Sequence, residues 1–116
     1  MPTDYRKLLE ACPLVDAQQQ ARIEARRNGP GLAKAIAADN KFMAAMVAEG
    51  NGALAAQPEL NAIYKEGMIA RERQLESGGQ GPQELRDELQ QKYRDGQTAQ
   101  SKAIDVLRNF CKSPSS

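Results

Sequence analysis

Side chains that could perform chemistry are few in this sequence, and carboxylates form the largest group. Glu84 and Glu88 are four residues apart with Asp87 beside them, so a helix would bring them to one side. Such a cluster can bind a metal or transfer a proton, but di-metal helical bundles add Glu-x-x-His motifs, and this chain contains no histidine. Lys92 follows Glu88 at the spacing of an ordinary surface ion pair. We therefore expect a solvated helix face, with no metal site and no cofactor site.

Nucleophilic catalysis has equally little support. Without histidine, the usual serine and cysteine triads lack their general base. Cys12 and Cys111 have no base in their local sequence and are far from a CxxC spacing, so we expect two reduced thiols in preference to a disulfide between the chain ends. The glycines match neither a dinucleotide-binding motif nor a phosphate-binding loop. We expect no catalytic residue and predict that the protein is not an enzyme.

The composition indicates a folded chain with a small core. Sixteen basic residues oppose 15 acidic ones, and this net charge of +1 disfavours both a disordered coil and generic nucleic-acid binding. Ile, Leu, Val and Phe account for only 20 of the 116 residues, and tryptophan is missing. Because a small domain buries a small fraction of its surface, a second copy would add core, and we expect a homodimer.

The chain start carries no apolar signal segment, and no apolar run is long enough to cross a membrane. We therefore expect a cytoplasmic protein.

Helices are the elements expected to position these side chains. Apolar residues recur every three or four positions, and the alternation typical of strands is missing. Helices are expected over 3–12 and 16–27, from Pro30, from Pro58, and from Pro82 to about Lys112, with Pro13 ending the first. The prediction is one all-α domain, residues 1–112, of five to six helices that ends in a long helical hairpin, followed by a frayed tail at 113–116.

Two features of these helices bear on packing. The inward positions expected in the third helix are Leu32, Ala35, Ile36, Met43 and Val47. Gly67 falls on the apolar side of the helix from Pro58, which is consistent either with a close helix crossing or with simple tolerance of glycine. The helix from Pro82 is either continuous or kinked at Gly96.

Binding of another protein is the function class that remains. The last helix carries a single narrow apolar stripe, which is too narrow to be buried on several sides. Methionine adapts its shape to a partner, and arginine is favoured at interfaces. The predicted partner or dimer interface consists of Met68, Arg71, Leu75, Leu85, Leu89, Tyr93, Leu107 and Phe110.

Two other functions stay open. Residues Arg22–Lys41 contain a helix, a glycine-containing turn and a second helix, which is the order of a DNA-binding helix-turn-helix. The phosphate contacts would be Arg22, Arg26, Arg27, Lys34 and Lys41. The second helix, however, begins GLAKAIAA and is poor in side chains that read base edges, so an ordinary helical hairpin is favoured. A phage or plasmid inhibitor of a host enzyme would show the same sequence features as a regulatory protein.

The whole-chain profile includes the long late helix "PQELRDELQQKYRDGQTAQSKAIDVLRNF" and lacks catalytic groups. In length and helical content it resembles the small all-helical bacterial anti-activators of quorum sensing, the QslA/TraM-like proteins. The resemblance implies a dimer that binds a LuxR-type transcription activator and blocks its dimerisation or its DNA binding. It transfers no functional residue to this chain.

Overall fold

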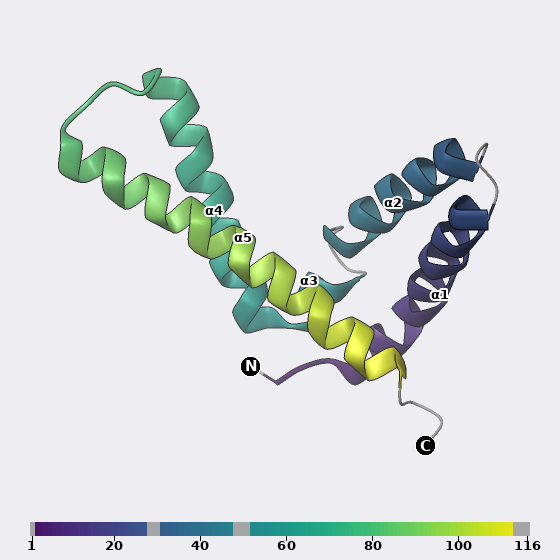
Figure 1. Ribbon diagram of the computed structural model, residues 1–116. Helices are drawn as coiled ribbons and strands as arrows, with labels where there is room; N and C mark the ends of the chain where they lie inside the picture. Colours follow the sequence, from purple (N-terminus) through teal and green to yellow (C-terminus); the bar gives the residue numbers. More distant parts are fainter. Residues whose placement is uncertain (1, 28–30, 48–51, 113–116) are drawn as a thin grey trace.

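A computed structural model describes residues 2–27, 31–47 and 52–112, and all regular structure in these ranges is helical (Figure 1). The five helices are α1 (Tyr5–Arg27), α2 (Leu32–Val47), α3 (Ala53–Ala56), α4 (Pro58–Ser77) and α5 (Gln83–Lys112). The predicted all-α class and terminal hairpin are confirmed. The expected helix start at Pro30 and the frayed tail lie outside the described residues. None of the helices described has the length and apolarity needed to cross a membrane.

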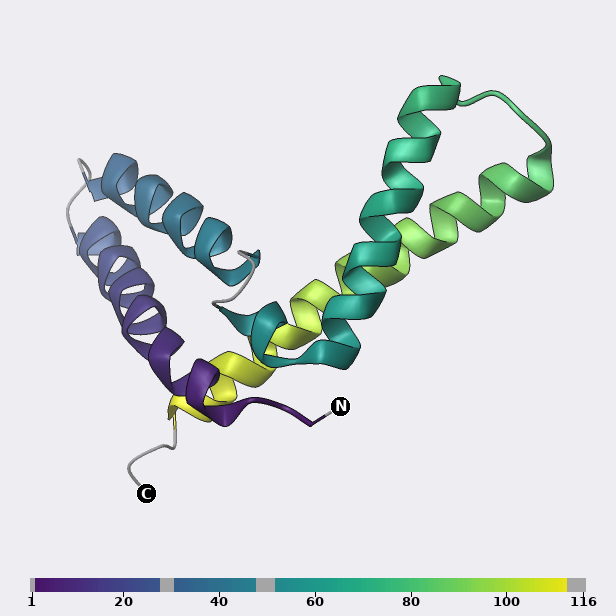
Figure 2. The ribbon, with the colours of Figure 1, turned by 180° about the vertical axis from the view of Figure 1, so that it is seen from behind.

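Two helical hairpins diverge from a shared corner and give the molecule a V shape (Figures 1 and 2). One arm is α1–α2 and the other is α4–α5, while the short helix α3 lies at the corner. The chain extends over 50 × 38 × 18 Å, and its radius of gyration is 16.8 Å. A compact domain of this length would have a radius of gyration of about 13 Å. The fold is therefore flat and open, and both arms expose two sides.

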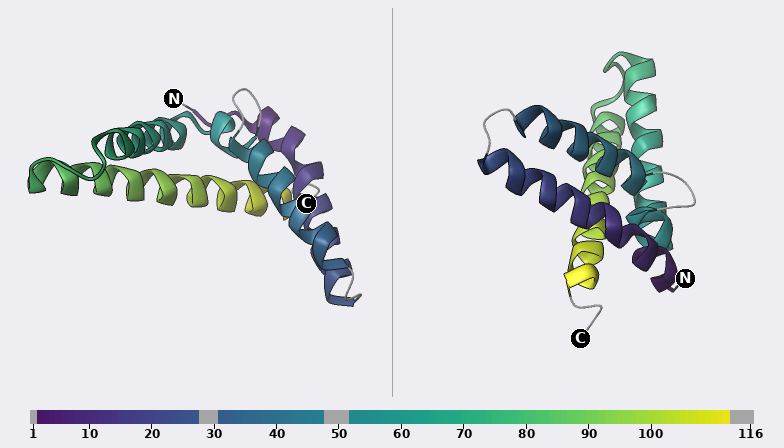
Figure 3. Two further views of the ribbon diagram at one scale, coloured as in Figure 1. Left: turned by 90° about the horizontal axis from the view of Figure 1, so that it is seen from above. Right: turned by 90° about the vertical axis from the view of Figure 1, so that its right-hand side faces the viewer.

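The hydrophobic core occupies the corner of the V. Figure 3 shows the α1–α2 hairpin crossing the C-terminal end of α5, which is where the core lies. The largest fully buried side chains are Leu8, Val15, Phe42, Met46, Leu54 and Leu107. Gln57, between α3 and α4, is also buried and donates hydrogen bonds to the carbonyls of Ala53 (3.2 Å) and Ala103 (2.9 Å). This amide connects the start of α4 to α5.

The prediction that Pro13 ends the first helix is wrong, because α1 continues through it for 23 residues. A proline inside a helix leaves the carbonyl four residues earlier, here that of Leu9, without its usual donor. Leu9 is exposed, so water can solvate that carbonyl. Leu8 and Val15, on either side of the proline, are both buried in the same core, and this packing favours a continuous helix.

The crossing of α4 and α5 is a glycine-to-glycine contact. A Cβ atom built on Gly67 would come within 2.8 Å of the Lys92 carbonyl oxygen and 2.9 Å of the Gly96 Cα. A Cβ built on Gly96 would come within 3.0 Å of the Gly67 Cα. Of the two explanations for Gly67, the close crossing is therefore confirmed. Gly96 marks this contact within one continuous helix of 30 residues.

The predicted inward face of α2 needs correction. Ala35 is buried as expected, but Leu32, Ile36 and Met43 are exposed, and Phe42 and Met46 are buried instead. Two apolar stripes lie side by side on α2, and the neighbouring helices cover only one of them. Periodicity identifies both stripes but does not say which of them a neighbour covers.

Polar side chains connect the two arms at the corner. Arg108 of α5 donates to the Gln18 Oε1 atom (3.0 Å), and Gln18 Nε2 donates to Asp39 Oδ1 (2.9 Å). Arg22 Nε donates to the same Asp39 oxygen at 3.1 Å. The hydrogen bond from Gln18, with further help from Arg22, lowers the pKa of Asp39 below its ordinary value. The guanidinium of Arg108 also lies 5.2 Å from the centre of the Phe42 ring.

The expectation of two reduced thiols is also corrected, because Cys12 and Cys111 form a disulfide. Their Cα atoms are 5.5 Å apart although the residues are separated by 99 positions. The neighbouring Tyr5 and Phe110 rings, with centroids 6.0 Å apart, pack across the same two helices. The two cysteines meet because α1 crosses the C-terminal end of α5, a contact that no local feature of the sequence indicates.

Candidate functional site

The carboxylates on α5 form an ordinary charged helix face. Glu84, Asp87 and Glu88 are all exposed. The predicted ion pair between Glu88 and Lys92 is confirmed at 3.5 Å. Within the three described ranges, no group of three or more histidine, cysteine, aspartate or glutamate side chains could hold a metal ion.

The ends of α4 in the α4–α5 arm are set by residues that favour those positions locally. Pro58 occupies the first turn of α4, where its missing N–H costs nothing, and Gly78 ends the helix in the left-handed conformation with φ 63°. The two helices touch at the Gly67–Gly96 crossing and part towards the loop that joins them (Figures 1 and 2). The arm is therefore tight in its middle and open at its tip.

Five of the predicted interface residues lie between the Gly67–Gly96 crossing and the loop and are wholly or partly exposed, and we call them the tip surface: Met68, Arg71, Leu75, Leu85 and Tyr93. The Arg71 guanidinium stacks over the Tyr93 ring at 5.2 Å from its centre, so the two helices meet through this pair. Leu75 is 65% exposed and Leu85 is 47% exposed, because the helices diverge beyond the crossing and do not cover them. The tip surface thus offers apolar side chains next to an arginine.

A cavity of about 500 Å³ opens between the diverging helices. Its walls include Arg71, Gln74, Leu75 and Leu89. Gln74 donates from Nε2 to Gln90 Oε1 at 3.0 Å, but its own buried Oε1 has no hydrogen-bond partner among the residues that the structure describes. A buried acceptor without a donor is costly, and such a group in a native protein calls for a physical reason. A donor supplied from outside the chain would satisfy it.

Of the other three predicted interface residues, Leu107 and Phe110 lie away from the tip surface, whereas Leu89 forms part of the wall of this cavity. Leu89 is buried between α4 and α5. Leu107 is fully buried in the corner core, and Phe110 packs against that core. Including Leu107 in an interface was therefore an error, because a side chain inside the core cannot contact another chain while the fold is intact. The apolar stripe of α5 faces three different environments along its length.

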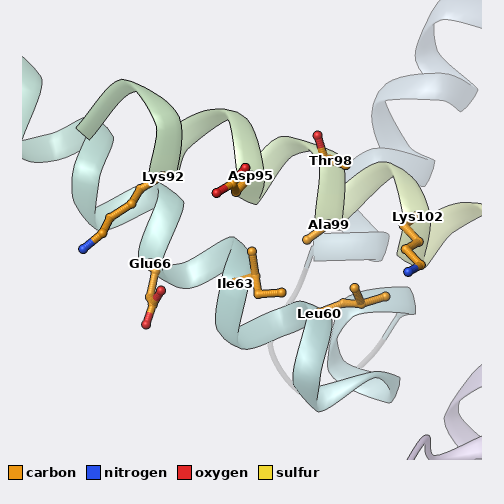
Figure 4. A pocket seen from close by; sticks show the side chains of 8 residues that line it. All are labelled: Leu60, Ile63, Glu66, Lys92, Asp95, Thr98, Ala99 and Lys102. Atoms are coloured by element: carbon orange, nitrogen blue, oxygen red, sulfur yellow. The ribbon is translucent and has the colours of Figure 1, made fainter. Parts of the chain in front are cut away.

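Sequence reasoning missed a groove on the opposite side of the same arm. Leu60, Ile63, Glu66, Lys92, Asp95, Thr98, Ala99 and Lys102 line its central part, which measures about 400 Å³ (Figure 4). One end extends to Val106, and the other reaches Ile69 and Leu89. In Figure 4, Leu60 and Ile63 point from α4 towards Ala99 of α5. We call this continuous surface the side groove.

The helical period explains why the two surfaces lie on opposite sides. Gly67 faces α5, and at 100° per residue Ile63 lies on one side of it while Met68 lies on the other. The broad apolar pattern of α4 contained this signal, since it extends to both sides of Gly67. The groove could not be predicted, because it also depends on which α5 residues lie level with Ile63.

The region considered as a DNA-binding helix-turn-helix forms a side-by-side antiparallel hairpin, α1–α2 (Figures 1 and 2). Arg22 is engaged with Asp39 at 3.1 Å. Arg26, Arg27, Lys34 and Lys41 are exposed. A helix-turn-helix crosses its two helices at a steep angle to present the second one to the major groove, and an antiparallel hairpin lacks that presentation.

Comparisons with known proteins do not assign a family. No protein-family model matches the chain, and neither the curated protein sequences nor the solved structures give a significant match.

Proposed function

We propose that this protein is a non-enzymatic regulator that binds another protein through its tip surface. The most concrete form of the proposal is an anti-activator that binds a LuxR-type transcription factor and blocks its dimerisation or its DNA binding. The observation that carries the proposal is the opening between α4 and α5, where Leu75 and Leu85 are exposed beside a cavity of about 500 Å³. Inhibition of a host enzyme by the same surface is the alternative.

The chemistry of the tip surface fits a protein partner. Large exposed apolar side chains are the usual anchors of an interface, and arginine and tyrosine are enriched among the residues that dominate binding energy. Arg71 is already held over Tyr93, so less of its side-chain entropy is lost on binding. The cavity's volume of about 500 Å³ can hold an apolar side chain from a partner helix, as in helix-in-groove recognition.

Gln74 adds a specific requirement. Its side chain lines this cavity, and its Oε1, which finds no donor in the described part of the chain, accepts hydrogen bonds. A partner that places a donor there gains a buried hydrogen bond, and one without a donor leaves Gln74 unsatisfied. The partner would therefore present an apolar anchor with a hydrogen-bond donor next to it.

The test is capture of partners from a lysate of the native host with the tagged protein and two matched variants. Leu75→Arg changes the tip surface, whereas Leu32→Arg changes α2 at a side chain of nearly equal exposure, 63% against 65%. We expect wild type and Leu32→Arg to retain one stoichiometric partner that Leu75→Arg loses. Loss with both variants, or with neither, would contradict a role for the tip surface.

The identity of the captured protein then distinguishes an anti-activator from an inhibitor of a host enzyme. If the partner is a transcription activator, adding the purified protein to that activator should abolish its shift of promoter DNA in a gel. Adding Leu75→Arg should leave the shift unchanged. An enzyme as the captured partner would favour the host-enzyme alternative.

A partner of this class would place the protein in the cytoplasm, where thiols are usually kept reduced, whereas disulfides are typical of oxidising compartments. The disulfide between Cys12 and Cys111 therefore makes the redox state in cells informative. Alkylation of thiols in intact cells, before and after reduction, would report it. Cysteines that react without prior reduction would agree with a cytoplasmic regulator, and protected cysteines would argue for an oxidising compartment.

A further inference from the structure

The surface area of the chain is large for a monomer. It amounts to 7850 Å² for 12.7 kDa. A folded monomer of that mass exposes about 6,200 Å². The excess, about 1,600 Å², is twice the roughly 800 Å² that each partner buries in a standard interface. The chain therefore has enough surplus surface for a stable dimer interface in addition to the tip surface.

The side groove is a long surface that is available for this purpose. Its central cavity shares Leu60 and Lys102 with the cavity at one end, and Glu66 and Lys92 with the cavity at the other. On α5 the groove runs from Leu89 to Val106, which is about 25 Å along the helix axis. At its Val106 end the groove is also lined by Thr3, which precedes α1.

The charges along this side of α5 identify which helix fits. Asp95 and Lys102 are exposed, opposite in charge and seven residues apart. Lys92 and Asp105, also exposed, flank them with the signs reversed. All four positions are symmetric about one point between residues 98 and 99. An identical antiparallel helix with its two-fold axis at that point therefore places a negative charge opposite each positive one.

We propose that the side groove is a homodimer interface, in which α5 of a second copy packs antiparallel against α5 with the two-fold axis between Thr98 and Ala99. Asp95 then faces Lys102 of the second copy, and Lys92 faces Asp105 of the second copy. Each pair occurs twice because the interface is symmetric.

Apolar side chains fill the space between these charges. Ile63 is 42% exposed and lines the same part of the groove as Thr98 and Ala99, so it lies next to the axis and close to its counterpart. Figure 4 shows Leu60 beside it, on the same wall. Val106 of the second copy falls opposite Gln91, at the end of the groove that Ile69 lines. The interface thus has an apolar centre and a charged rim, which is the usual anatomy.

This proposal is independent of the proposed function, because it uses the opposite side of the arm. The tip residues Met68, Arg71 and Leu75 stay exposed in this dimer. Loss of partner binding through Leu75→Arg would leave the dimer unchanged, and loss of the dimer would not by itself remove the partner surface. The two proposals can therefore fail separately.

Exchanging the charges of Asp95 and Lys102 tests the register in which the two α5 helices are paired. Asp95→Lys alone places lysine opposite Lys102, and Lys102→Asp alone places aspartate opposite Asp95, twice per dimer in each case. Each single variant should weaken dimerisation at least tenfold in sedimentation equilibrium at low salt. The double variant restores opposite charges and should recover most of the affinity. Glu76→Lys, an exposed change on the far side of α4, is the matched control and should behave as wild type.

Cross-linking tests the position of the axis. Two copies of Thr98→Cys would lie within about 2 Å of each other along the helix axis, whereas two copies of Gln91→Cys would lie about 22 Å apart. Mild oxidation should produce a covalent dimer from Thr98→Cys and none from Gln91→Cys on a non-reducing gel.

Three results would overturn the proposal. One is a wild type that stays monomeric at concentrations of about 100 μM, at which even a weak dimer of micromolar Kd would be populated. Another is a double charge-exchange variant no tighter than either single variant. The third is a dimer that survives Ile63→Arg with unchanged affinity. Because Ile63 is partly exposed, this variant should keep the helical content of the wild type, which circular dichroism would check.

Discussion

The glycine contact between α4 and α5 gives the sharpest prediction about the fold. In an exposed helix interior, replacing glycine by alanine stabilises a protein by about 1 kcal/mol, because glycine has more conformational freedom to lose. At Gly67 the new methyl group would instead come within 2.8 Å of the Lys92 carbonyl oxygen and 2.9 Å of the Gly96 Cα. Both are backbone atoms, so no flexible side chain can move aside.

The magnitude follows from these two opposing effects. Ordinary van der Waals contact begins near 3.4 Å, so the helices must separate by about half an ångström to admit the methyl group. Overpacking of this kind costs about 1–3 kcal/mol. After subtraction of the gain in helix propensity, Gly67→Ala should lower the free energy of unfolding by about 1 kcal/mol, or the Tm by about 4 °C.

Urea and thermal unfolding followed by circular dichroism would measure this change. Ala62→Gly, at an exposed position inside α4, is the matched control and should lower stability by about 1 kcal/mol through propensity alone. Gly96→Ala should behave like Gly67→Ala, and the double variant should cost less than the sum, because one separation of the helices accommodates both methyl groups. A Gly67→Ala variant more stable than wild type would refute the close crossing.

Three further predictions concern the corner of the V. Because the Cys12–Cys111 disulfide closes a loop of about 100 residues, reduction should lower the free energy of unfolding by about 4–5 kcal/mol; identical urea midpoints with and without reductant would contradict this. Gln57→Leu should lose about 1–3 kcal/mol, because it removes the two buried hydrogen bonds that the Gln57 amide donates to backbone carbonyls, whereas Gln83→Leu at an exposed position should change little in the same unfolding experiment. The lowered pKa of Asp39 means that its stabilising contribution is complete above about pH 4, near the pKa of the unfolded chain, and is lost as the pH falls through the lower value in the folded protein. Stability measured from pH 6 to pH 2 should therefore fall less steeply in Asp39→Asn than in wild type, and equal slopes would contradict that assignment.

The sequence predicts those parts of the fold that local signals determine. The start of α4 at Pro58 and its end at Gly78 follow from residues that favour those positions on their own. Pro13 also favours a helix end, but the core contacts on both sides of it override this local preference. The disulfide was missed for a related reason, since no local signal reports that α1 crosses the end of α5.

Of the two candidate surfaces, one could be predicted from local spacing and the other could not. Met68, Arg71 and Leu75 share one helix face by spacing alone, so periodicity was enough to group them. The side groove depends on the alignment of two helices, which is set by Gly67 against Gly96. That contact was one of two explanations that the sequence allowed for Gly67. The charges of α5 are symmetric about residues 98 and 99, but this pattern indicates an interface only if no other helix covers that side of α5. The sequence alone does not show which side is left uncovered.

The last prediction joins the two proposed surfaces. An antiparallel α5–α5 pairing centred near residue 98 points the two hairpin tips in opposite directions, because each tip lies at the N-terminal end of its α5. Each tip surface then remains open, and the dimer should bind two partner molecules. We expect a complex of two chains with two partners by light scattering. Lys102→Asp, which weakens the dimer, should give a one-to-one complex of unchanged intrinsic affinity. A wild-type dimer that binds a single partner would show that the two tips do not act as separate sites.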